Sequence, residues 1–228
     1  MIALIPAKKI SRRLENKNLA KLKNKPLIWY TINEAKKSKN ISRIIVSTDC
    51  EKIKKISIKY GAEVLFMRPK KFCSNKSSLL DVCNHAVNWL KVHEKQKKIH
   101  SLIALQPTSP LRKYYDIDNC IKIFKRNKAD LVTTFCIAKP KGWYKEFGKK
   151  KFFGKFLSKN DLTTQTAKKN FLLNGAVYIF SQKFLQHKKS TKNYAYIMPK
   201  ERSVDIDDII DFQMAEIYLK KSKRKIYG

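Results

Sequence analysis

The residues with the clearest chemical potential lie between positions 5 and 19, where a short apolar run leads into a basic, polar segment, IPAKKISRRLENKNL. Cationic, hydroxyl and amide side chains of this kind are donors suited to the oxygens of a triphosphate. The segment lacks the Gly-rich P-loop pattern, and in so basic a chain a solvated surface loop is the alternative interpretation. The donors are Lys8, Lys9, Ser11, Arg12, Arg13, Lys17 and Asn18.

A second chemical feature is the acidic run SVDIDD near the C-terminus. Asp205 and Asp207 flank Ile206, and in an extended stretch their carboxylates lie on the same side because side chains alternate with period two. A divalent cation fits between them, since Mg²⁺ is typically held by one or two carboxylates together with phosphate oxygens and water. The alternative is that Asp207 or Asp208 only caps the helix that follows.

The elements that must position these residues follow an α/β rhythm, in which short apolar runs alternate with stretches of helical periodicity. This pattern predicts a three-layer fold, a mostly parallel twisted sheet flanked by helices. The predicted strands are 2–6, 43–47, 63–67, 101–106, 131–136 and 171–180. The predicted amphipathic helices are 27–37, 50–60, 78–92, 117–125 and 208–220.

Ligands of open α/β sheets sit beyond the carboxyl ends of the strands, and several predicted strands are followed there by polar residues. These are residues 8–18, Ser47 to Asp49, Arg68, and the segment from Gln106 to Arg112. The aromatic and Lys-rich stretch 139–170 breaks the rhythm, and we interpret it as an excursion, either a dimerisation arm or a surface hairpin. The length of 228 residues predicts a single domain.

The charge balance, 51 Lys and Arg against 18 Asp and Glu, first suggests nucleic-acid binding. The lysines are spread over the whole chain, so we expect no nucleic-acid partner, and a basic surface would also steer anionic nucleotides and sugar acids. No stretch of about 18 apolar residues occurs, so we expect no membrane partner and a cytoplasmic protein. The five cysteines lack metal or redox spacing and are expected to be reduced thiols.

Several motifs together resemble one enzyme family. The opening segment has the form IPA-K-x-x-S-R-x-x-x-x-KNL, followed in order by KPLIWYTINEAKKS, IIVSTD, GAEVLFMRP, SSLLDV, LQPTSPLR, LNGAVYIF and PKERSVDIDDIIDF. These segments cover nearly the whole chain and resemble the CMP-sialic acid synthetases (acylneuraminate cytidylyltransferases), which include the CMP-legionaminate and CMP-pseudaminate synthetases. The family resemblance implies a nucleotide-diphospho-sugar transferase-like, Rossmann-like fold and a homodimer.

The resemblance also implies a reaction and a set of site residues. CMP would pass from CTP to the anomeric 2-hydroxyl of a nine-carbon 2-keto-3-deoxy sugar acid, for use in cell-surface polysaccharide, with Mg²⁺ as cofactor and pyrophosphate as leaving group. Asp205 and Asp207 are then the metal ligands, and Asp208 is the helix cap. Lys8, Lys17 and Asp207 would be catalytic; Lys8, Ser11, Arg12, Lys17, Asn18, Arg68 and Ser78 would bind the nucleotide; Gln106, Gln165 and Asn174 would bind the sugar.

The chain departs from the family pattern at five positions, the first of which is Lys8, where the family usually has arginine. Lys9 and Ile10 replace the family's glycines, which would be costly if the backbone required positive φ there. Thr164 and Leu172 stand where arginines commonly hold the sugar carboxylate, so another cation, such as Lys145, Lys168 or Lys169, would have to take that role. For Gln106 a structural turn-capping role, and for Arg112 a surface position, remain the alternatives.

Two other functions are considered. The first is activation of the eight-carbon acid 3-deoxy-manno-octulosonate, although the S-T-R-x-P loop usual in that group is absent here. The second is a basic protein that binds RNA or a partner without turnover. The LNGAVYIF segment resembles the neuraminate and legionaminate branches more than the pseudaminate branch.

Overall fold

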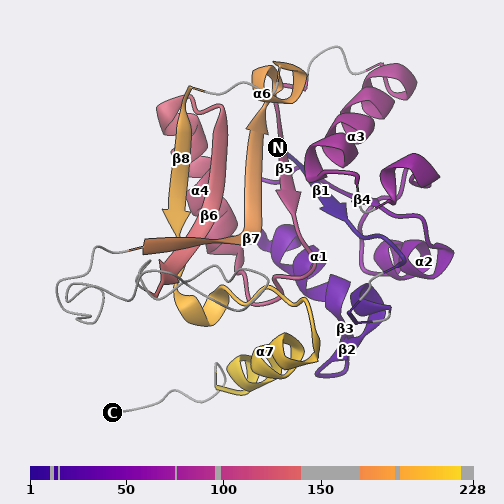
Figure 1. The fold of residues 1–228 in the computed structure, drawn as a ribbon. Helices are drawn as coiled ribbons and strands as arrows, with labels where there is room; N and C mark the ends of the chain where they lie inside the picture. Colours follow the sequence, from indigo (N-terminus) through magenta and orange to yellow (C-terminus); the bar gives the residue numbers. More distant parts are fainter. Residues whose placement is uncertain are drawn as a thin grey trace, which may run out of the picture.

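The computed structural model describes residues 1–10, 13–14, 16–74, 76–95, 99–139, 170–187 and 191–221. Its centre is a six-stranded sheet in the order β4-β1-β5-β7-β6-β8 (Figure 1). The strands are β1 (Ile2–Pro6), β4 (Arg43–Ser47), β5 (Ser101–Leu105), β6 (Leu131–Ala138), β7 (Asn170–Ser181) and β8 (Asn193–Ile197).

All strands but β7 run in one direction. β1 pairs in parallel with β4 and β5, and β6 pairs in parallel with β8. β7 lies between the two groups and is antiparallel to both β5 and β6. The carboxyl ends of five strands therefore meet at one edge of the sheet, together with the beginning of β7, and this is the edge at which ligands of such folds bind.

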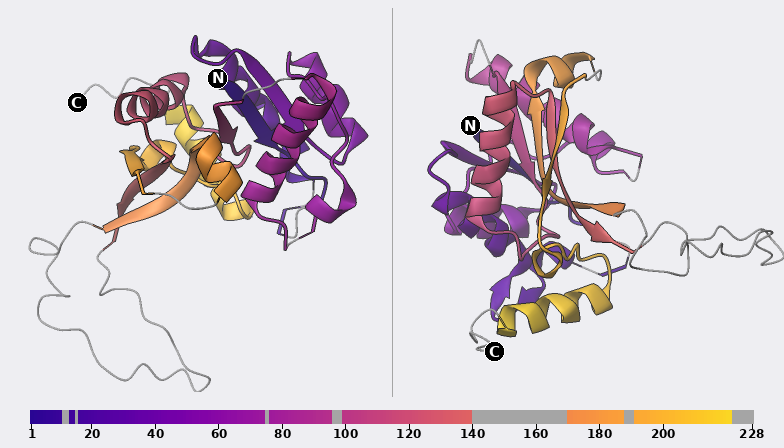
Figure 2. Two further views of the ribbon diagram at one scale, coloured as in Figure 1. Left: turned by 90° about the horizontal axis from the view of Figure 1, so that it is seen from above. Right: turned by 90° about the vertical axis from the view of Figure 1, so that its left-hand side faces the viewer.

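Helices cover the sheet from both sides, which explains why the strands are continuous apolar runs rather than alternating ones. On one face, α1 (Leu27–Lys37), α2 (Glu51–Lys59) and α4 (Tyr114–Asn127) contribute to a core that includes Ile5, Ile32 and Ile117. On the other face, α3 (Leu79–His93) and α6 (Gln182–His187) form a core around Leu4 and Leu102 (Figure 2).

A third, smaller core holds the C-terminal helix against the carboxyl edge of the sheet. α7 (Ile209–Lys221) lies beyond that edge, close to the hairpin formed by β2 (Lys21–Leu22) and β3 (Lys25–Pro26) (Figure 1). Leu22, Leu111 and Ile206 are almost completely buried in this cluster. Because Ile206 is anchored there, the aspartates on either side of it are held at the edge of the sheet.

Most of the predicted elements are confirmed, several at their predicted bounds. The predicted strand 63–67 is wrong: it forms only two isolated parallel bridges, Ile45 to Glu63 and Thr48 to Met67. Between these bridges Leu65 and Phe66 pack into the α3-side core, which interrupts the register. The β2–β3 hairpin, α6 and β8 were not predicted from the sequence. Most of the proposed excursion, residues 140–169, lies outside the described residues.

The remaining expectations concern thiols and membranes. All five cysteines are free thiols, as expected from the sequence, and the structure buries four of them. Within the described ranges, no helix is both long and apolar enough to cross a membrane.

Candidate active site

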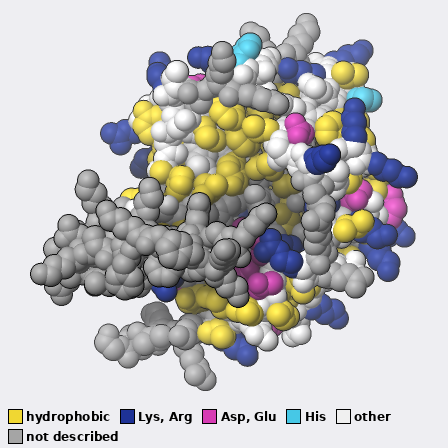
Figure 3. Space-filling model, in the orientation of Figure 1, with side chains coloured by type: hydrophobic (Ala, Val, Ile, Leu, Met, Phe, Trp, Pro, Cys, Tyr) yellow, Lys and Arg dark blue, Asp and Glu magenta, His cyan; other side chains and the backbone are white. Residues whose placement is uncertain are grey.

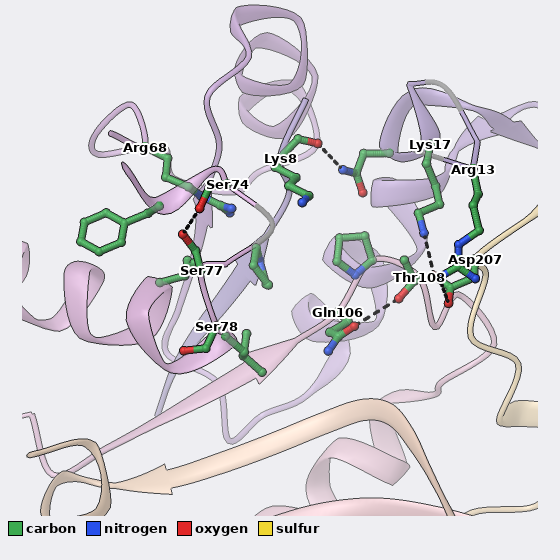
Figure 4. Close-up of a pocket in the computed structure, with 16 residues that line it drawn as sticks. Lys8, Arg13, Lys17, Arg68, Ser74, Ser77, Ser78, Gln106, Thr108 and Asp207 are labelled. Carbon is green, nitrogen blue, oxygen red and sulfur yellow. Dashed lines mark hydrogen bonds and ion pairs between the residues drawn. The ribbon is translucent and has the colours of Figure 1, made fainter. Parts of the chain in front are cut away.

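A cleft of about 390 Å³ opens at the carboxyl edge of the sheet, where β1 and β5 end (Figure 4). Its side chains come from segments far apart in the sequence, including the basic loop after β1, the start of α3 and the acidic run near the C-terminus. Seven residues predicted from the sequence to form the site line this one cleft: Lys8, Lys17, Asn18, Arg68, Ser78, Gln106 and Asp207.

The basic loop is tied to the scaffold at both ends. At its start the backbone N–H of Lys9 donates to Asp49 Oδ1 over 2.6 Å. At its end Asn18, which is almost fully buried, donates from Nδ2 to the carbonyl of Lys8 over 2.9 Å. Lys9 and Ile10 are not among the described residues with positive φ, so this loop does not require the two glycines usual in the family. Ser11 and Arg12 lie outside the described residues.

One side of the cleft is a charged wall, made of Arg13, Lys17 and Asp207 (Figure 4). Lys17 Nζ lies 3.4 Å from Asp207 Oδ1 and donates to the carbonyl of Ile206 over 2.6 Å. Arg13 Nη2 lies 3.4 Å from the other carboxylate oxygen, Oδ2. The catalytic residues proposed from distant parts of the sequence, Lys17 and Asp207, are therefore in direct contact.

The three aspartates of the acidic run have different hydrogen-bond partners. Asp208 Oδ1 accepts from the N–H groups of Ile210 and Asp211, which makes it the cap of α7, as predicted. Asp205 bonds to the side chain of Thr108, and surrounding atoms together with the negative charge of Asp207 raise the pKa of Asp205. A pair of neighbouring carboxylates is a fitting donor set for a hard divalent cation.

The acidic run offers a cation few side-chain ligands. No group of three or more His, Cys, Asp or Glu side chains gathers anywhere in the described part of the chain. The metal ligands predicted from the sequence, Asp205 and Asp207, are two carboxylates, and Mg²⁺ is typically held by one or two carboxylates together with phosphate oxygens and water.

The opposite side of the cleft is a serine wall, made of Arg68, Ser74, Ser77 and Ser78 (Figure 4). Arg68 is only 6% exposed and donates to the hydroxyl and the carbonyl of Ser47 at the end of β4. Burial lowers the pKa of Arg68, and the nearby Asp49 charge only partly offsets this effect. Ser78 caps α3 in a reciprocal capping box with Asp81, so the N-terminus of that helix faces the cleft.

The floor between the two walls is fixed by a buried arginine. Arg112 is 1% exposed and donates to the carbonyls of Gln106 and Ala176 and to the hydroxyl of Thr31. Burial lowers its pKa to about 10. The surface position considered for Arg112 is therefore wrong: its guanidinium joins the turn after β5 to β7 and α1 through these hydrogen bonds.

Gln106 lines the cleft directly, with Oε1 accepting from Thr108 over 3.3 Å. Gly175 in β7 lies close by, with φ of +70°, and a Cβ placed there would come within 3.4 Å of Asp205 Oδ2. A glycine at this position therefore allows β7 to approach both Gln106 and the acidic run.

Asn174 is placed differently from the other predicted residues. It is 3% exposed; its Oδ1 accepts from Thr134 Oγ1 over 2.5 Å, and its Nδ2 donates to Ser203 Oγ over 2.9 Å. These bonds join β6 and β7 to the segment before the acidic run, so its contact with a sugar stays a prediction. Gln165, Thr164, Lys145, Lys168 and Lys169 lie outside the described residues.

The cleft also contains residues that the site prediction did not include. Phe72, Ser74, Ser77 and Thr108 line it. Arg13, which was noted as a donor of the basic loop but given no role in the site, also lines the cleft and pairs with Asp207. A signal for Thr108 was present, because it follows the end of a predicted strand within QPTSPLR. The loop 70–77 carries no comparable signal, because its position depends on the packing of Phe72 against His85 of α3.

Comparison with known proteins connects this geometry to a family. A family model described as Cytidylyltransferase matches residues 2–224. The chain belongs to the cytidylyltransferase family. The family predicted from the sequence motifs is thereby confirmed.

Three curated relatives define the neighbourhood of this cytidylyltransferase. It is 34% identical to an N-acylneuraminate cytidylyltransferase of Escherichia coli over 99% of the chain, but it spans only 54% of that relative's length. It is 32% identical to the post-translational flagellin modification protein B of Campylobacter coli, covering 97% of the chain and 95% of the relative. A CMP-N,N'-diacetyllegionaminic acid synthase of Legionella pneumophila is 31% identical, with coverages of 95% and 94%.

Solved structures confirm the fold class. A CMP:2-keto-3-deoxy-manno-octonic acid synthetase in complex with CTP superposes with a TM-score of 0.72 at 14% identity, covering 97% of this chain and 98% of that one. A 4-diphosphocytidyl-2C-methyl-D-erythritol synthase from Anaerococcus prevotii gives a TM-score of 0.62 at 15% identity. At these identities the likeness concerns the fold, a mostly parallel sheet flanked by helices.

Proposed function

We propose that this cytidylyltransferase transfers CMP from CTP to the anomeric 2-hydroxyl of a nine-carbon 2-keto-3-deoxy sugar acid and releases pyrophosphate. The observation that carries the proposal is the meeting of Lys8, Lys17, Arg68 and Asp207 in one cleft at the carboxyl edge of the sheet. Nucleotidyl transfer develops negative charge on the α-phosphate and the departing pyrophosphate, and fixed cations stabilise that charge.

The two walls suggest where each part of CTP binds. Lys8 and Lys17, at either end of the basic loop, supply cations for the phosphates, and Lys17 is held in place by the carbonyl of Ile206. The serine wall and the almost fully buried Arg68 suit the uncharged nucleoside, whose polar groups need hydrogen-bond partners rather than exposed charge. Ser11 and Arg12 stay nucleotide-binding candidates on the strength of the motif.

Asp205 and Asp207 would hold a Mg²⁺ ion. When bound, the ion would neutralise phosphate charge and help to align the leaving group. Lys17 keeps its contact with Asp207 from the inner side of the cleft and orients that carboxylate. Asp211 accepts from the backbone N–H groups of Asp207 and Asp208, which fixes the direction of the acidic run.

The acceptor site would lie toward β7. Gln106 extends into the cleft beside Gly175, and its amide can bond sugar hydroxyls without adding charge. Asn174 and Gln165 stay proposed sugar-binding residues. Leu172 is 59% exposed and offers no cation, so a lysine elsewhere would have to bind the sugar carboxylate.

The relatives favour a neuraminate- or legionaminate-type acceptor. A Legionella legionaminic acid synthase is 31% identical over nearly its full length, whereas a pseudaminic acid cytidylyltransferase of Campylobacter jejuni is 27% identical. The enzyme named for 2-keto-3-deoxy-manno-octonic acid shares 14% identity and supports the fold alone. That acid remains the second candidate acceptor.

A homodimer is also proposed. Large apolar side chains remain exposed on β6, β7 and β8 at the end nearest the site. Several large apolar side chains exposed near one end of a sheet support an interaction site there. The residues are Ile137, Phe171, Leu172, Leu173 and Ile197, with exposures from 41% to 59%. A monomer by light scattering would contradict this proposal.

The charge distribution gives little support to a nucleic-acid partner. On the face seen in Figure 3, Lys and Arg side chains are scattered around the molecule rather than gathered into one stripe. A binding surface for a polyanion would concentrate them.

The decisive experiment measures pyrophosphate release from CTP and Mg²⁺ with neuraminate, legionaminate, pseudaminate and the eight-carbon acid. We expect turnover with one nine-carbon acid and with CTP but not ATP, GTP or UTP. Turnover with the eight-carbon acid alone would favour the second candidate. Salt-sensitive RNA binding without CTP turnover would overturn the enzymatic proposal.

A further inference from the structure

The pairing of Arg13 with Asp207 has no counterpart in the family motif, which leaves position 13 unspecified. Each oxygen of the Asp207 carboxylate faces a different cation: Oδ1 lies 3.4 Å from Lys17 Nζ, and Oδ2 lies 3.4 Å from Arg13 Nη2. The two cations differ in how they are held. The Lys17 side chain is 12% exposed and bonded to a backbone carbonyl, whereas the Arg13 side chain is 67% exposed.

This difference determines which cation can leave. Lys17 is anchored by its 2.6 Å bond to the carbonyl of Ile206 and by its surroundings. Arg13 lies on the basic loop, and its guanidinium is held at the cleft by an exposed ion pair, an interaction worth little in water. A divalent cation bound to Asp207 needs carboxylate oxygens free of competing donors. Arg13 is therefore the group that must give up Oδ2.

The cleft offers the displaced guanidinium a new partner. Arg13 lines the same cleft as Lys8 and Lys17, where the proposed function places the phosphates. A planar guanidinium binds phosphate oxygens through two parallel hydrogen bonds, which a lysine cannot do. We propose that Arg13 is an exchangeable counter-ion, which pairs with Asp207 before substrate arrives and moves to the phosphates of CTP when a divalent cation takes its place. This inference rests on the proposed function.

The proposal predicts effects of opposite sign in Arg13→Ala. Without nucleotide, the variant should bind Mn²⁺ about 1.5- to 5-fold more tightly, because a competing exposed ion pair is lost. With Mg²⁺ present, it should bind CTP about tenfold more weakly, because a charge-assisted hydrogen bond is lost. If the substitution only damaged the loop, the affinities for Mn²⁺ and for CTP would both fall. Opposite changes in the two affinities therefore distinguish an exchangeable counter-ion from a structural role.

Both affinities can be measured without turnover. Electron paramagnetic resonance of free Mn²⁺ gives metal binding, and calorimetry without sugar acid gives CTP binding. Lys21→Ala is the matched charge control, because Lys21 is an exposed lysine of β2 that does not line the cleft. It should change neither affinity appreciably. Arg13→Lys should keep the wild-type Mn²⁺ affinity and lose part of the CTP affinity.

The remaining outcomes separate this inference from the proposed function. Unchanged or weaker Mn²⁺ binding in Arg13→Ala, with Mn²⁺ binding lost in Asp207→Asn, would overturn the role of Arg13 and leave the metal site standing. Undetectable Mn²⁺ binding in the wild type, or wild-type Mn²⁺ binding in Asp207→Asn, would overturn both the metal assignment and the counter-ion role.

Discussion

The two walls of the cleft differ in what holds them in place. On the charged wall, Asp207 is paired with two cations from the basic loop, and side-chain exposure reaches 67%. On the serine wall, Arg68 is 6% exposed and is held by the hydroxyl and carbonyl of one strand-end residue, Ser47. Exposed ion pairs exchange partners at small cost, whereas a buried hydrogen-bonded group resists movement. The charged wall is thus suited to chemistry that changes charge, and the serine wall to recognition of a fixed shape.

The largest expected effect is on the charged wall. Asp207→Asn keeps the size of the side chain but removes its charge, and we expect turnover at saturating CTP to fall by about 10²–10³-fold or more. Initial rates of pyrophosphate release would measure the loss. Because Asp207 is half exposed, the variant should unfold close to the wild-type temperature.

Asp208→Ala is the matched control for that variant. It removes the neighbouring carboxylate, which caps α7, and should cost about 1 kcal/mol of stability while the folded enzyme keeps its turnover. Equal activity losses in the two variants would mean that the acidic run acts on activity through the fold rather than through charge at Asp207.

The next effect tests the serine wall. Arg68→Met keeps the long side chain and removes the donors, so the KM for CTP should rise about 10- to 100-fold with a much smaller change in kcat. Arg43→Met is the control at the opposite end of β4, where Arg43 pairs with Glu63 and Glu94. That variant should lose stability without a change in KM. A kcat loss in Arg68→Met that exceeds its KM change would contradict the distinction between the walls.

Ser78 belongs to the serine wall and also caps α3. Ser78→Ala breaks the capping box and should lower the free energy of unfolding by about 1 kcal/mol in urea titrations. Ser78→Asp should restore the cap but place a negative charge in the cleft, and therefore weaken CTP binding. If Ser78→Asp bound CTP as tightly as the wild type, Ser78 would be a cap without a role in nucleotide binding.

The smallest effect is a pH dependence of stability behind the serine wall. His85 packs against Phe66 and Phe72, its Nδ1 has no hydrogen-bond partner in the described structure, and burial together with Arg68 and Lys71 lowers its pKa. Because the folded state binds this proton less readily than the unfolded state, stability should fall as pH drops below the unfolded value of about 6.5. His85→Phe should flatten that part of the urea-denaturation profile, and an unchanged slope would refute this origin.

Sequence reasoning succeeded where a local pattern determines the structure. The strands 2–6 and 43–47 and the helix 27–37 were predicted at their observed bounds, because buried apolar runs and helical periodicity are local signals. The wrong strand at 63–67 fails for a tertiary reason, since Leu65 and Phe66 leave the register to pack against α3-side residues. β8 has no fully buried residue, so it lacks the buried apolar run by which the other strands were predicted.

In the site too, residues within local motifs were predictable and contacts between distant segments were not. Motif positions gave Lys17, Arg68 and Asp207, and all three line the cleft. The pairing of Arg13 with Asp207 and the burial of Arg112 depend on contacts between segments 194 and 64 residues apart, which no local pattern encodes. The backbone strain considered for Ile10 is absent, because Ile10 does not have a positive φ.

The antiparallel strand β7 has a consequence for how the enzyme can diversify. Because β7 runs against β6, the two strands meet at Ala138 and Asn170, and the intervening 31 residues leave and re-enter the sheet at neighbouring points beside the active site. Joining two ends that paired strands already hold together depends only weakly on the number of residues between them. Evolution can therefore lengthen, shorten or rewrite this insert at little thermodynamic cost, while the cleft at the ends of β1 and β5 is inherited intact.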